Sequence, residues 1–279
     1  MAQIIMINSL DPEELQIYKS CNEAQLLHYF EPNGGLFIAE SPMVVERALD
    51  AGYKPYSMLL DEALLKKQGS MEDDRIGSLI ERCGDIPVYC GPESLLGRLT
   101  GFKLTRGILC AMYRMPLSCL DDTCRNAHRI AVLDGVENPA NVGSIFRNAA
   151  AFGIDAVLLT SDCSDPLYRR SLRVSMGTSL ILPWTIIETS AAVDYTGFLH
   201  SFGFTAAALA LRENSLRPDD KKIRQADKLA LVLGNEGFGL PDDVISRCDH
   251  TVMIPMQNGV DSLNVAAASA VAFWELRKR

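Results

Sequence analysis

The chain has 279 residues, of which 48% are hydrophobic, 22% charged and 7% aromatic, as in a folded globular protein. Its formal net charge is −8, with 12 basic and 18 acidic residues before Arg129 and 15 basic and 17 acidic residues from there on. Neither part has the basic excess of a non-specific nucleic-acid binder, so an RNA-binding site would have to be a local patch.

The sequence contains no apolar run of about 18 residues, and no basic segment precedes a long apolar run near its start. We therefore expect a protein that neither spans a membrane nor is exported. Its eight cysteines form no C-x-x-C pair, and no histidine stands at a zinc-ligand spacing from them. These features predict no metal site, reduced cysteines and a cytoplasmic location.

The length predicts about two domains. In the first 113 residues, short apolar runs alternate with helical patterns, which is typical of an α/β domain. Helical patterns cover 15–30, 43–52, 76–84 and 93–99, and strand-like runs cover 35–41, 56–60, 87–90 and 107–114. Residues 114–128 have no sustained period, so we interpret them as a linker.

A second α/β alternation occupies residues 129–279. Strands are expected at 130–133, 155–160, 182–187, 204–209, 229–234 and 250–255. Helices are expected at 141–153, 166–177 and near 191–202, then after Pro241 and from about Ser262. The predicted fold class is therefore α/β in both parts.

The first segment with chemical potential runs from Leu133 to Gly153. A strand ends at a turn there, and a helix begins beside Asn141 and Gly143 with unpaired backbone amides. Arg147 follows one helical turn later and could stand beside whatever occupies the turn. An N-capped helix with a solvated arginine explains this segment equally well.

The second segment, 231–240, is an apolar strand that runs into Gly234, Gly237 and Gly239. Such glycines allow a close backbone approach to a ligand. The spacing is G-x-x-G-x-G without a following ribose-binding acid, which disfavours a nicotinamide enzyme. Glu236 is the carboxylate between the glycines, and an exposed loop acid is the alternative interpretation of this residue.

The third segment runs from Val252 to the end of the chain. Ile254 and Pro255 close a strand, a flexible loop follows, and Ser262 and Asn264 stand where a helix N-terminus exposes polar groups. The alanine-rich helix after them suits either ordinary helix packing or tight self-association.

These three segments together resemble the SpoU/TrmH-type RNA ribose 2′-O-methyltransferases of the SPOUT class. The resemblance depends on N-x-G-x-x-x-R at 141–147, G-x-E-x-x-G at 234–239, and I-P-M with S-L-N at 254–264. The first part, with GGLFIAES and VVERALDAG, is similar to the substrate-binding domain that precedes the catalytic domain in many members. Members commonly carry Asp-Pro where this chain has Asn138-Pro139.

The resemblance implies a trefoil-knotted, parallel-sheet catalytic domain at 129–279, preceded by a smaller α/β RNA-binding-like domain at 1–113. It also implies S-adenosylmethionine as the cofactor, and the residues expected to contact it are Gly234, Ile254 and Leu263. The residues expected at the catalytic centre are Arg147, Asn141, Glu236, Ser262 and Asn264.

The reaction needs the ribose hydroxyl in line with the methyl group and help in removing its proton. All four histidines fall outside the three segments. Arginine is normally protonated, so we expect Arg147 to bind the target phosphate and stabilise the developing alkoxide, and the family role of a base is the alternative. We expect Asn141 to brace the loop and Glu236 to orient Arg147 or the ribose, with Ser262 and Asn264 completing the hydroxyl-binding site.

Arg169, Arg170 and Arg173 form a local basic patch beside a tyrosine and are candidates for RNA binding, although a solvated helix face is the alternative. Family members are dimers through the knotted region, so a homodimer is expected. The sequence thus predicts an RNA ribose 2′-O-methyltransferase, with ribosomal RNA favoured over transfer RNA. The alternatives are a catalytically silent knotted RNA-binding factor and a small-molecule dehydrogenase, which the missing dinucleotide fingerprint disfavours.

Overall fold

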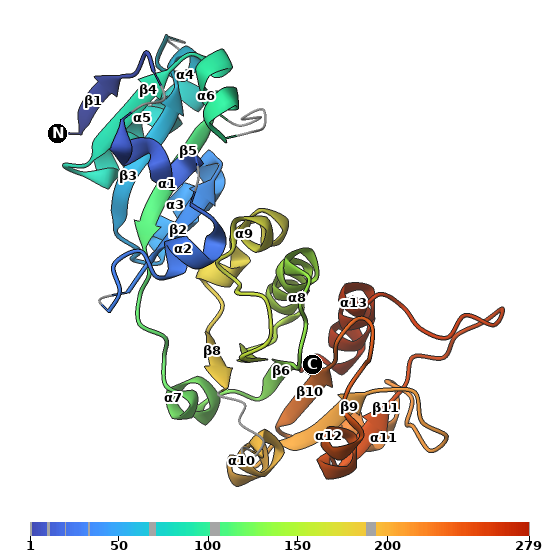
Figure 1. Cartoon of the computed structure of the whole chain (residues 1–279). Helices are drawn as coiled ribbons and strands as arrows, with labels where there is room; N and C mark the ends of the chain where they lie inside the picture. Colours follow the sequence, from blue (N-terminus) through green and yellow to red (C-terminus); the bar gives the residue numbers. More distant parts are fainter. Residues whose placement is uncertain are drawn as a thin grey trace. The chain divides into compact units, whose positions relative to one another are not determined.

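The computed structural model describes residues 2–9, 12–19, 21–32, 34–66, 71–100, 107–187 and 194–278 (Figure 1). The chain forms two compact units. One comprises Met1–Pro116 and Leu167–Ile181, and the other comprises Leu117–Pro166 and Leu182–Arg279. The domain boundaries expected at 113 and 129 stay a prediction, and the helix α7 (Leu120–Arg125) forms within the expected linker.

The first unit contains a five-stranded mixed sheet. Its strand order is β1 (Gln3–Met6), β4 (Pro87–Gly91), β3 (Pro55–Asp61), β5 (Ile108–Tyr113) and β2 (Leu36–Glu40). The strands β1, β4 and β3 are parallel, and β5 is antiparallel to both of its neighbours. The four strand-like runs in this part are thereby confirmed, whereas β1 was not predicted.

The helices of the first unit pack around this sheet. They are η1 (Glu13–Leu15), α1 (Gln16–Lys19), α2 (Glu23–Leu27), α3 (Pro42–Asp50), α4 (Glu62–Lys66), α5 (Met71–Cys83), α6 (Glu93–Thr100), α9 (Arg169–Ser175) and η2 (Thr178–Leu180). The helical pattern at 15–30 is interrupted because Asn22 starts a new helix. Its side chain accepts from the Gln25 amide at 2.9 Å, and the Gln25 side chain accepts from the Asn22 amide at 2.8 Å.

The second unit is built on a six-stranded sheet in which every strand pair is parallel. The strand order is β11 (His250–Val252), β9 (Thr205–Leu209), β10 (Leu229–Leu233), β6 (Arg129–Leu133), β7 (Ala156–Thr160) and β8 (Trp184–Ile187). All six strands predicted in this part are confirmed. Their near-continuous apolar sequences reflect burial on both faces of a parallel sheet.

Helices cover this sheet. They are α7, α8 (Pro139–Phe152), α10 (Tyr195–Ser201), α11 (Lys221–Arg224), α12 (Asp242–Arg247) and α13 (Val265–Leu276). The side chains of α7, α10 and α12 share one hydrophobic core with alternate residues of the strands. Helices α8 and α13 pack against each other (Figure 1). Residues 191–193 of the helix expected near 191–202 lie outside the described residues.

Together these elements confirm the predicted α/β class, and the trefoil knot stays a prediction. In the described part of the chain, no helix combines the length and the apolar sequence that a membrane span requires.

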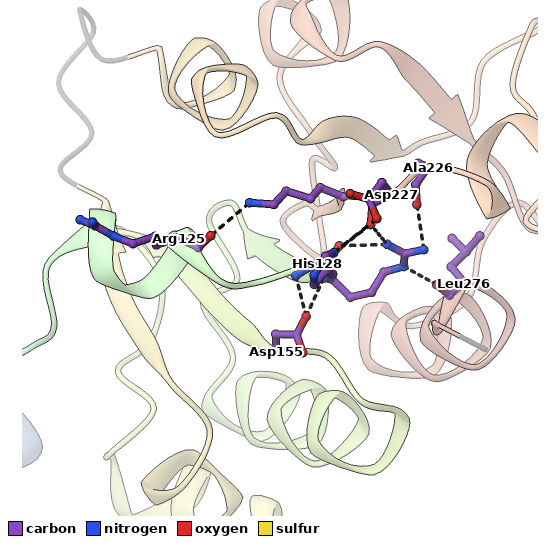
Figure 2. A network of polar contacts seen from close by, with 8 residues as sticks. Arg125, His128, Asp155, Ala226, Asp227 and Leu276 are labelled. Carbon is purple, nitrogen blue, oxygen red and sulfur yellow. Dashed lines mark hydrogen bonds and ion pairs between the residues drawn. The ribbon is translucent and has the colours of Figure 1, made fainter.

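Arg129, at the start of β6, is buried and donates four hydrogen bonds to backbone carbonyls of the second unit. Its Nε donates to Leu276 at 2.9 Å and its Nη2 to Ala226 at 2.9 Å. Its Nη1 donates to His128 at 3.0 Å and to Asp227 at 2.8 Å. Figure 2 labels the four residues that provide these acceptors, His128, Ala226, Asp227 and Leu276. The last turn of α13 is thereby attached to the sheet.

Asp155 supports the same network from the other side. Its Oδ2 accepts from the backbone amides of His128 at 2.7 Å and Arg129 at 2.8 Å (Figure 2). Burial lowers the pKa of the Arg129 guanidinium, and the nearby carboxylates of Asp155 and Asp227 oppose this shift. Burying the charged Arg129 side chain therefore costs free energy. Removing it would also cost free energy, because the carbonyl groups around it would lose their hydrogen-bond donor.

The substitution Arg129→Met should lower the free energy of unfolding of the second unit by about 3 kcal/mol, because four carbonyls lose a charged donor. Both tryptophans, Trp184 and Trp274, lie in this unit, so urea unfolding followed by tryptophan fluorescence measures its stability. Arg125→Met is the matched control, since the Arg125 side chain is exposed. If the two variants have the same free energy of unfolding, the hydrogen bonds of Arg129 contribute nothing to the stability of this unit.

Candidate functional site

The three segments meet because the strands before them belong to one parallel sheet. Strand β10 pairs with β6 so that Leu233 lies opposite Leu133, and β9 lies between β10 and β11. The loops after β6, β10 and β11 therefore leave the sheet at its carboxyl edge, where ligands bind in open α/β sheets.

A pocket of about 730 Å³ opens at this edge and is lined by the loops after β9, β10 and β11. Its lining includes residues 233–242, 252–254 and 261–265. Gly234, Ile254 and Leu263, the expected cofactor contacts, all line it, and so do Glu236, Ser262 and Asn264. The volume matches the usual size of a small-molecule or cofactor site. The structure thus brings together six of the eight residues that the resemblance assigns to the catalytic and cofactor sites.

Asn141 connects the three segments by hydrogen bonds. It is buried in the first turn of α8, where its Nδ2 donates to Glu236 Oε1 at 2.8 Å. Its Oδ1 accepts from Asn264 Nδ2 at 3.2 Å. The Asn264 side chain in turn caps α13 by accepting from the Ala266 amide at 2.9 Å. One amide side chain therefore sets the position of both the Glu236 carboxylate and the beginning of α13.

Helix α8 begins two residues earlier than expected, at Pro139, with Asn138 as its N-cap. The Asn138 side chain accepts from the Ala140 amide at 2.9 Å, and its backbone amide donates to Glu236 Oε1 at 3.2 Å. An aspartate at position 138 could accept the same capping bond. It would also place a second carboxylate beside Glu236, which the asparagine of this chain avoids.

Gly234 lies against the backbone of its own loop. A Cβ on this residue would stand 2.5 Å from the carbonyl carbon of Gly239 and 2.6 Å from the amide nitrogen of Leu240. The loop closes on itself here because the amides of Asn235 and Gly239 each donate to the carbonyl of the other, at 3.1 and 3.0 Å. Gly239 has a φ of +71°, which favours glycine.

Asn235 was not among the predicted site residues, yet it holds this loop together. Its Oδ1 accepts from the amides of Gly237 at 2.8 Å and Phe238 at 3.2 Å, and its Nδ2 donates to the Gly135 carbonyl at 2.7 Å. The loop after β10 is thus attached to the loop after β6. The preference of asparagine for turns could have indicated the bonds of Asn235 within its own loop, but nothing in the sequence indicates the contact with Gly135.

A half-buried acid, Asp134, follows the end of β6. The Asp134 amide donates to the Leu233 carbonyl at 2.8 Å, and Asp134 Oδ2 accepts from the Tyr195 hydroxyl at 2.6 Å. Burial raises the pKa of Asp134, an effect that the Tyr195 hydrogen bond partly offsets. Burial, followed by the bond to the Asp134 carboxylate, raises the pKa of Tyr195. Neither residue was predicted at the site.

Arg147 lies on the exposed side of α8 and is not among the described residues that line the pocket. Its predicted catalytic role therefore has no support from the pocket geometry within one chain. Among the described residues, no group of three or more His, Cys, Asp or Glu side chains is placed to hold a metal ion.

The three arginines predicted to bind RNA lie on α9, in the first unit. Arg169 is half-buried, and its Nε donates to Glu40 Oε2 at 3.0 Å. Burial lowers the pKa of the Arg169 guanidinium, and Glu40 opposes the shift. Arg170 and Arg173 are exposed. Arg169 thus already neutralises a buried acid of β2, and only the other two present their charge to solvent.

The substitution Gly234→Ala should lower the free energy of unfolding of the second unit by about 2 kcal/mol, because a methyl group there overlaps the Gly239 backbone. Gly237→Ala is the matched control. A Cβ on Gly237 would meet only Asn235 Oδ1, at 3.5 Å, so a change within about 0.5 kcal/mol is expected. Tryptophan fluorescence during urea unfolding measures the free energy of unfolding of both variants. An equal decrease in the two would contradict the described loop geometry.

Comparison with known proteins places these features in a family. The sequence model of the SpoU rRNA Methylase family matches residues 128–274. An uncharacterized tRNA/rRNA methyltransferase of Mycobacterium tuberculosis is 36% identical over 249 residues, which is 88% of this chain and 82% of that protein. The 23S rRNA (guanosine(2553)-2′-O)-methyltransferase RlmP of Bacillus subtilis is 27% identical over 241 residues, covering 86% of this chain and 88% of RlmP.

The fold has solved counterparts as well. The AdoMet-bound rRNA methyltransferase of Sinorhizobium meliloti superimposes with a TM-score of 0.78 at 21% identity, over 98% of this chain and 97% of that one. The SpoU methyltransferase AviRb of Streptomyces viridochromogenes superimposes with a TM-score of 0.75 at 21% identity, over 95% and 96% of the two chains. With the family match over more than half of its length, the chain belongs to the SpoU rRNA methylase family of RNA methyltransferases.

Proposed function

We propose that the chain transfers a methyl group from S-adenosylmethionine to a ribose 2′-hydroxyl of structured RNA, with ribosomal RNA favoured over transfer RNA. The observation that carries the proposal is the pocket at the carboxyl edge of the parallel sheet. Residues of the second and third motifs line it, and Asn141 of the first motif is hydrogen-bonded to two of them, Glu236 and Asn264. The relative RlmP, named as a 23S rRNA 2′-O-methyltransferase, supports both the reaction and the RNA class.

The pocket is suited to S-adenosylmethionine. Leu209, Val252, Ile254 and Leu263 give it apolar walls against which an adenine could pack, and Gly234 leaves backbone groups accessible. We assign Gly234, Ile254 and Leu263 to cofactor binding. When bound there, the cofactor supplies a methyl group on a positively charged sulfur, which makes the methyl carbon electrophilic.

The substrate hydroxyl needs an acceptor that holds it in line with that carbon. We assign this role to Glu236, whose Oε1 is occupied by Asn138 and Asn141 and whose Oε2 takes part in neither bond. Asn264 and Ser262 lie beside it in the pocket lining and complete the hydroxyl-binding site. We assign the hydroxyl proton to the Glu236 carboxylate, which would accept it as the ribose oxygen takes the methyl group and the carbon–sulfur electron pair stays with the sulfur.

In this proposal, Arg147 supplies a positive charge that acts on the RNA substrate. An arginine stays protonated at neutral pH, so it binds the target phosphate and stabilises the developing alkoxide. Its exposed position on α8 is compatible with contact to a bound RNA. The first unit selects the RNA, and Arg170 and Arg173 contribute exposed positive charge to that unit.

The protein acts as a homodimer in this proposal. The exposed face of α13 carries Ala267, Val271 and Trp274, and the Trp274 side chain is 54% exposed. An apolar stripe of this kind on a C-terminal helix is suited to pairing with a second copy.

Methyl transfer can be measured with labelled S-adenosylmethionine on ribosomal subunits and transfer RNA from cells that lack the protein. We expect label in ribosomal RNA, at one position that resists alkaline cleavage. Arg147→Ala should lower the rate at least about a hundredfold, because a charge that stabilises the alkoxide is lost. Its affinity for S-adenosylmethionine in calorimetry should stay unchanged, and Arg125→Ala serves as the control.

Other outcomes separate the alternatives. Label in transfer RNA alone would replace the proposed substrate. Binding of S-adenosylmethionine without transfer to either RNA would contradict the proposed activity and favour a silent RNA-binding factor. Label that remains sensitive to alkaline cleavage would place the methyl group elsewhere than on the ribose.

Sedimentation velocity tests the dimer. The wild type should sediment at twice the chain mass, and Trp274→Glu should shift it toward the monomer because a carboxylate would be buried in the interface. Trp274→Phe, which keeps an apolar ring, should remain dimeric. A monomeric wild type at micromolar concentration would contradict the proposal.

A further inference from the structure

The loop after β10 presents one aromatic ring to solvent. Phe238 is 94% exposed, the highest value among the large hydrophobic residues that the structure describes as exposed. A phenylalanine buries a large apolar area when it is covered, so leaving it in water forgoes the stabilisation that burial would give. Isolated exposed apolar residues are common, and this one needs an explanation only because of where it lies.

The backbone that carries the ring is held in place. The Phe238 amide donates to Asn235 Oδ1 at 3.2 Å, and the paired amides and carbonyls of Asn235 and Gly239 close the loop on either side. Asn235 is itself bonded to the Gly135 carbonyl, so the loop is attached to the β6 end of the sheet. The position of Phe238 is thus set by the same bonds that shape the site.

Phe238 lines the pocket together with Glu236 and Asn264. A ribose that delivers its 2′-hydroxyl to this pocket has to leave the stacked arrangement of a helix, and its base then needs a new stacking partner. An exposed aromatic ring at the pocket lining offers such a surface.

The charges of the pocket lining favour a contact of this kind. Among the described residues that line the pocket, the single basic side chain is Arg212, and its guanidinium is ion-paired with Asp242. The lining also contains the acids Glu236 and Asp261. The negatively charged RNA backbone would gain little electrostatic attraction from this lining. Stacking of a base on the uncharged Phe238 ring does not depend on such attraction.

From these observations, and on the basis of the proposed function, we infer that Phe238 is a base-stacking residue that holds the target nucleotide of the RNA, or its immediate neighbour, at the pocket. It contributes to RNA binding and not to cofactor binding. RNA is the occupant because the ring lies at the pocket that receives the ribose in the proposed function.

The test compares Phe238→Ala, Phe238→Leu and Phe238→Trp in the full chain, on the ribosomal subunits that the wild type methylates. Loss of the ring should raise the KM for this RNA about fivefold to a hundredfold, as loss of one stacked base does. The leucine variant should resemble the alanine variant because it keeps apolar bulk without an aromatic face. The tryptophan variant should retain the wild-type KM. Ile181→Ala, which removes another exposed apolar side chain outside the second unit, is the control.

Calorimetry with S-adenosylmethionine and sedimentation velocity are carried out on the same variants. An unchanged KM in Phe238→Ala, or full function in Phe238→Leu, would overturn the inference. A matching loss of cofactor affinity or of the dimer would also overturn it, because the ring would then belong to the cofactor site or to the subunit interface.

The inference can be separated from the proposed function. If the wild type methylates no RNA, the function fails, but filter binding of labelled ribosomal RNA to the wild type and Phe238→Ala still measures the stacking contribution. Equal affinities there would overturn the inference. Normal methylation by Phe238→Ala with an unchanged KM would overturn the inference and leave the function intact.

Discussion

The site depends on one buried amide, the side chain of Asn141. It is bonded to Glu236, which lies 95 residues away in sequence, and to Asn264, which lies 123 residues away. A carboxylate would repel Glu236 at this position, and an apolar side chain would leave the polar groups of both partners unpaired. An amide, which both donates and accepts, can satisfy both partners.

Stability and site geometry are linked through α13. Its first turn is capped by Asn264 in the pocket, and its last turn is held through the Leu276 carbonyl by Arg129. Between the two, Asn148 Nδ2 on α8 donates to the Ala266 carbonyl at 2.9 Å and to Ser269 Oγ at 3.0 Å. The helix is therefore bonded at both ends and along one side.

Much of the second unit could be predicted from the sequence because its strands are buried on both faces. Runs such as those at 130–133 and 229–234 are almost entirely apolar, and glycine or a polar residue ends each one. The start of α8 was misplaced by two residues because Asn138 and Asn141 are both plausible caps, and only the observed bond to the Ala140 amide distinguishes them.

The parts that could not be predicted depend on long-range backbone contacts. The acceptors of Arg129 are carbonyl groups, which every residue carries, so no residue type signals that network. Helix α9 belongs to the first unit, where Arg169 pairs with Glu40, 129 residues earlier in sequence. Neither the basic sequence of α9 nor the apolar sequence of β2 indicates that Arg169 and Glu40 are in contact.

The central claim is that the pocket formed by the loops after β9, β10 and β11 binds the methyl donor. A crystal structure of the chain with S-adenosylhomocysteine, the demethylated form of the donor, tests it most directly. The account predicts ligand density between Gly234, Ile254 and Leu263, with the sulfur directed toward Glu236. Density elsewhere on the chain, or a pocket that stays empty at saturating ligand concentration, would contradict it.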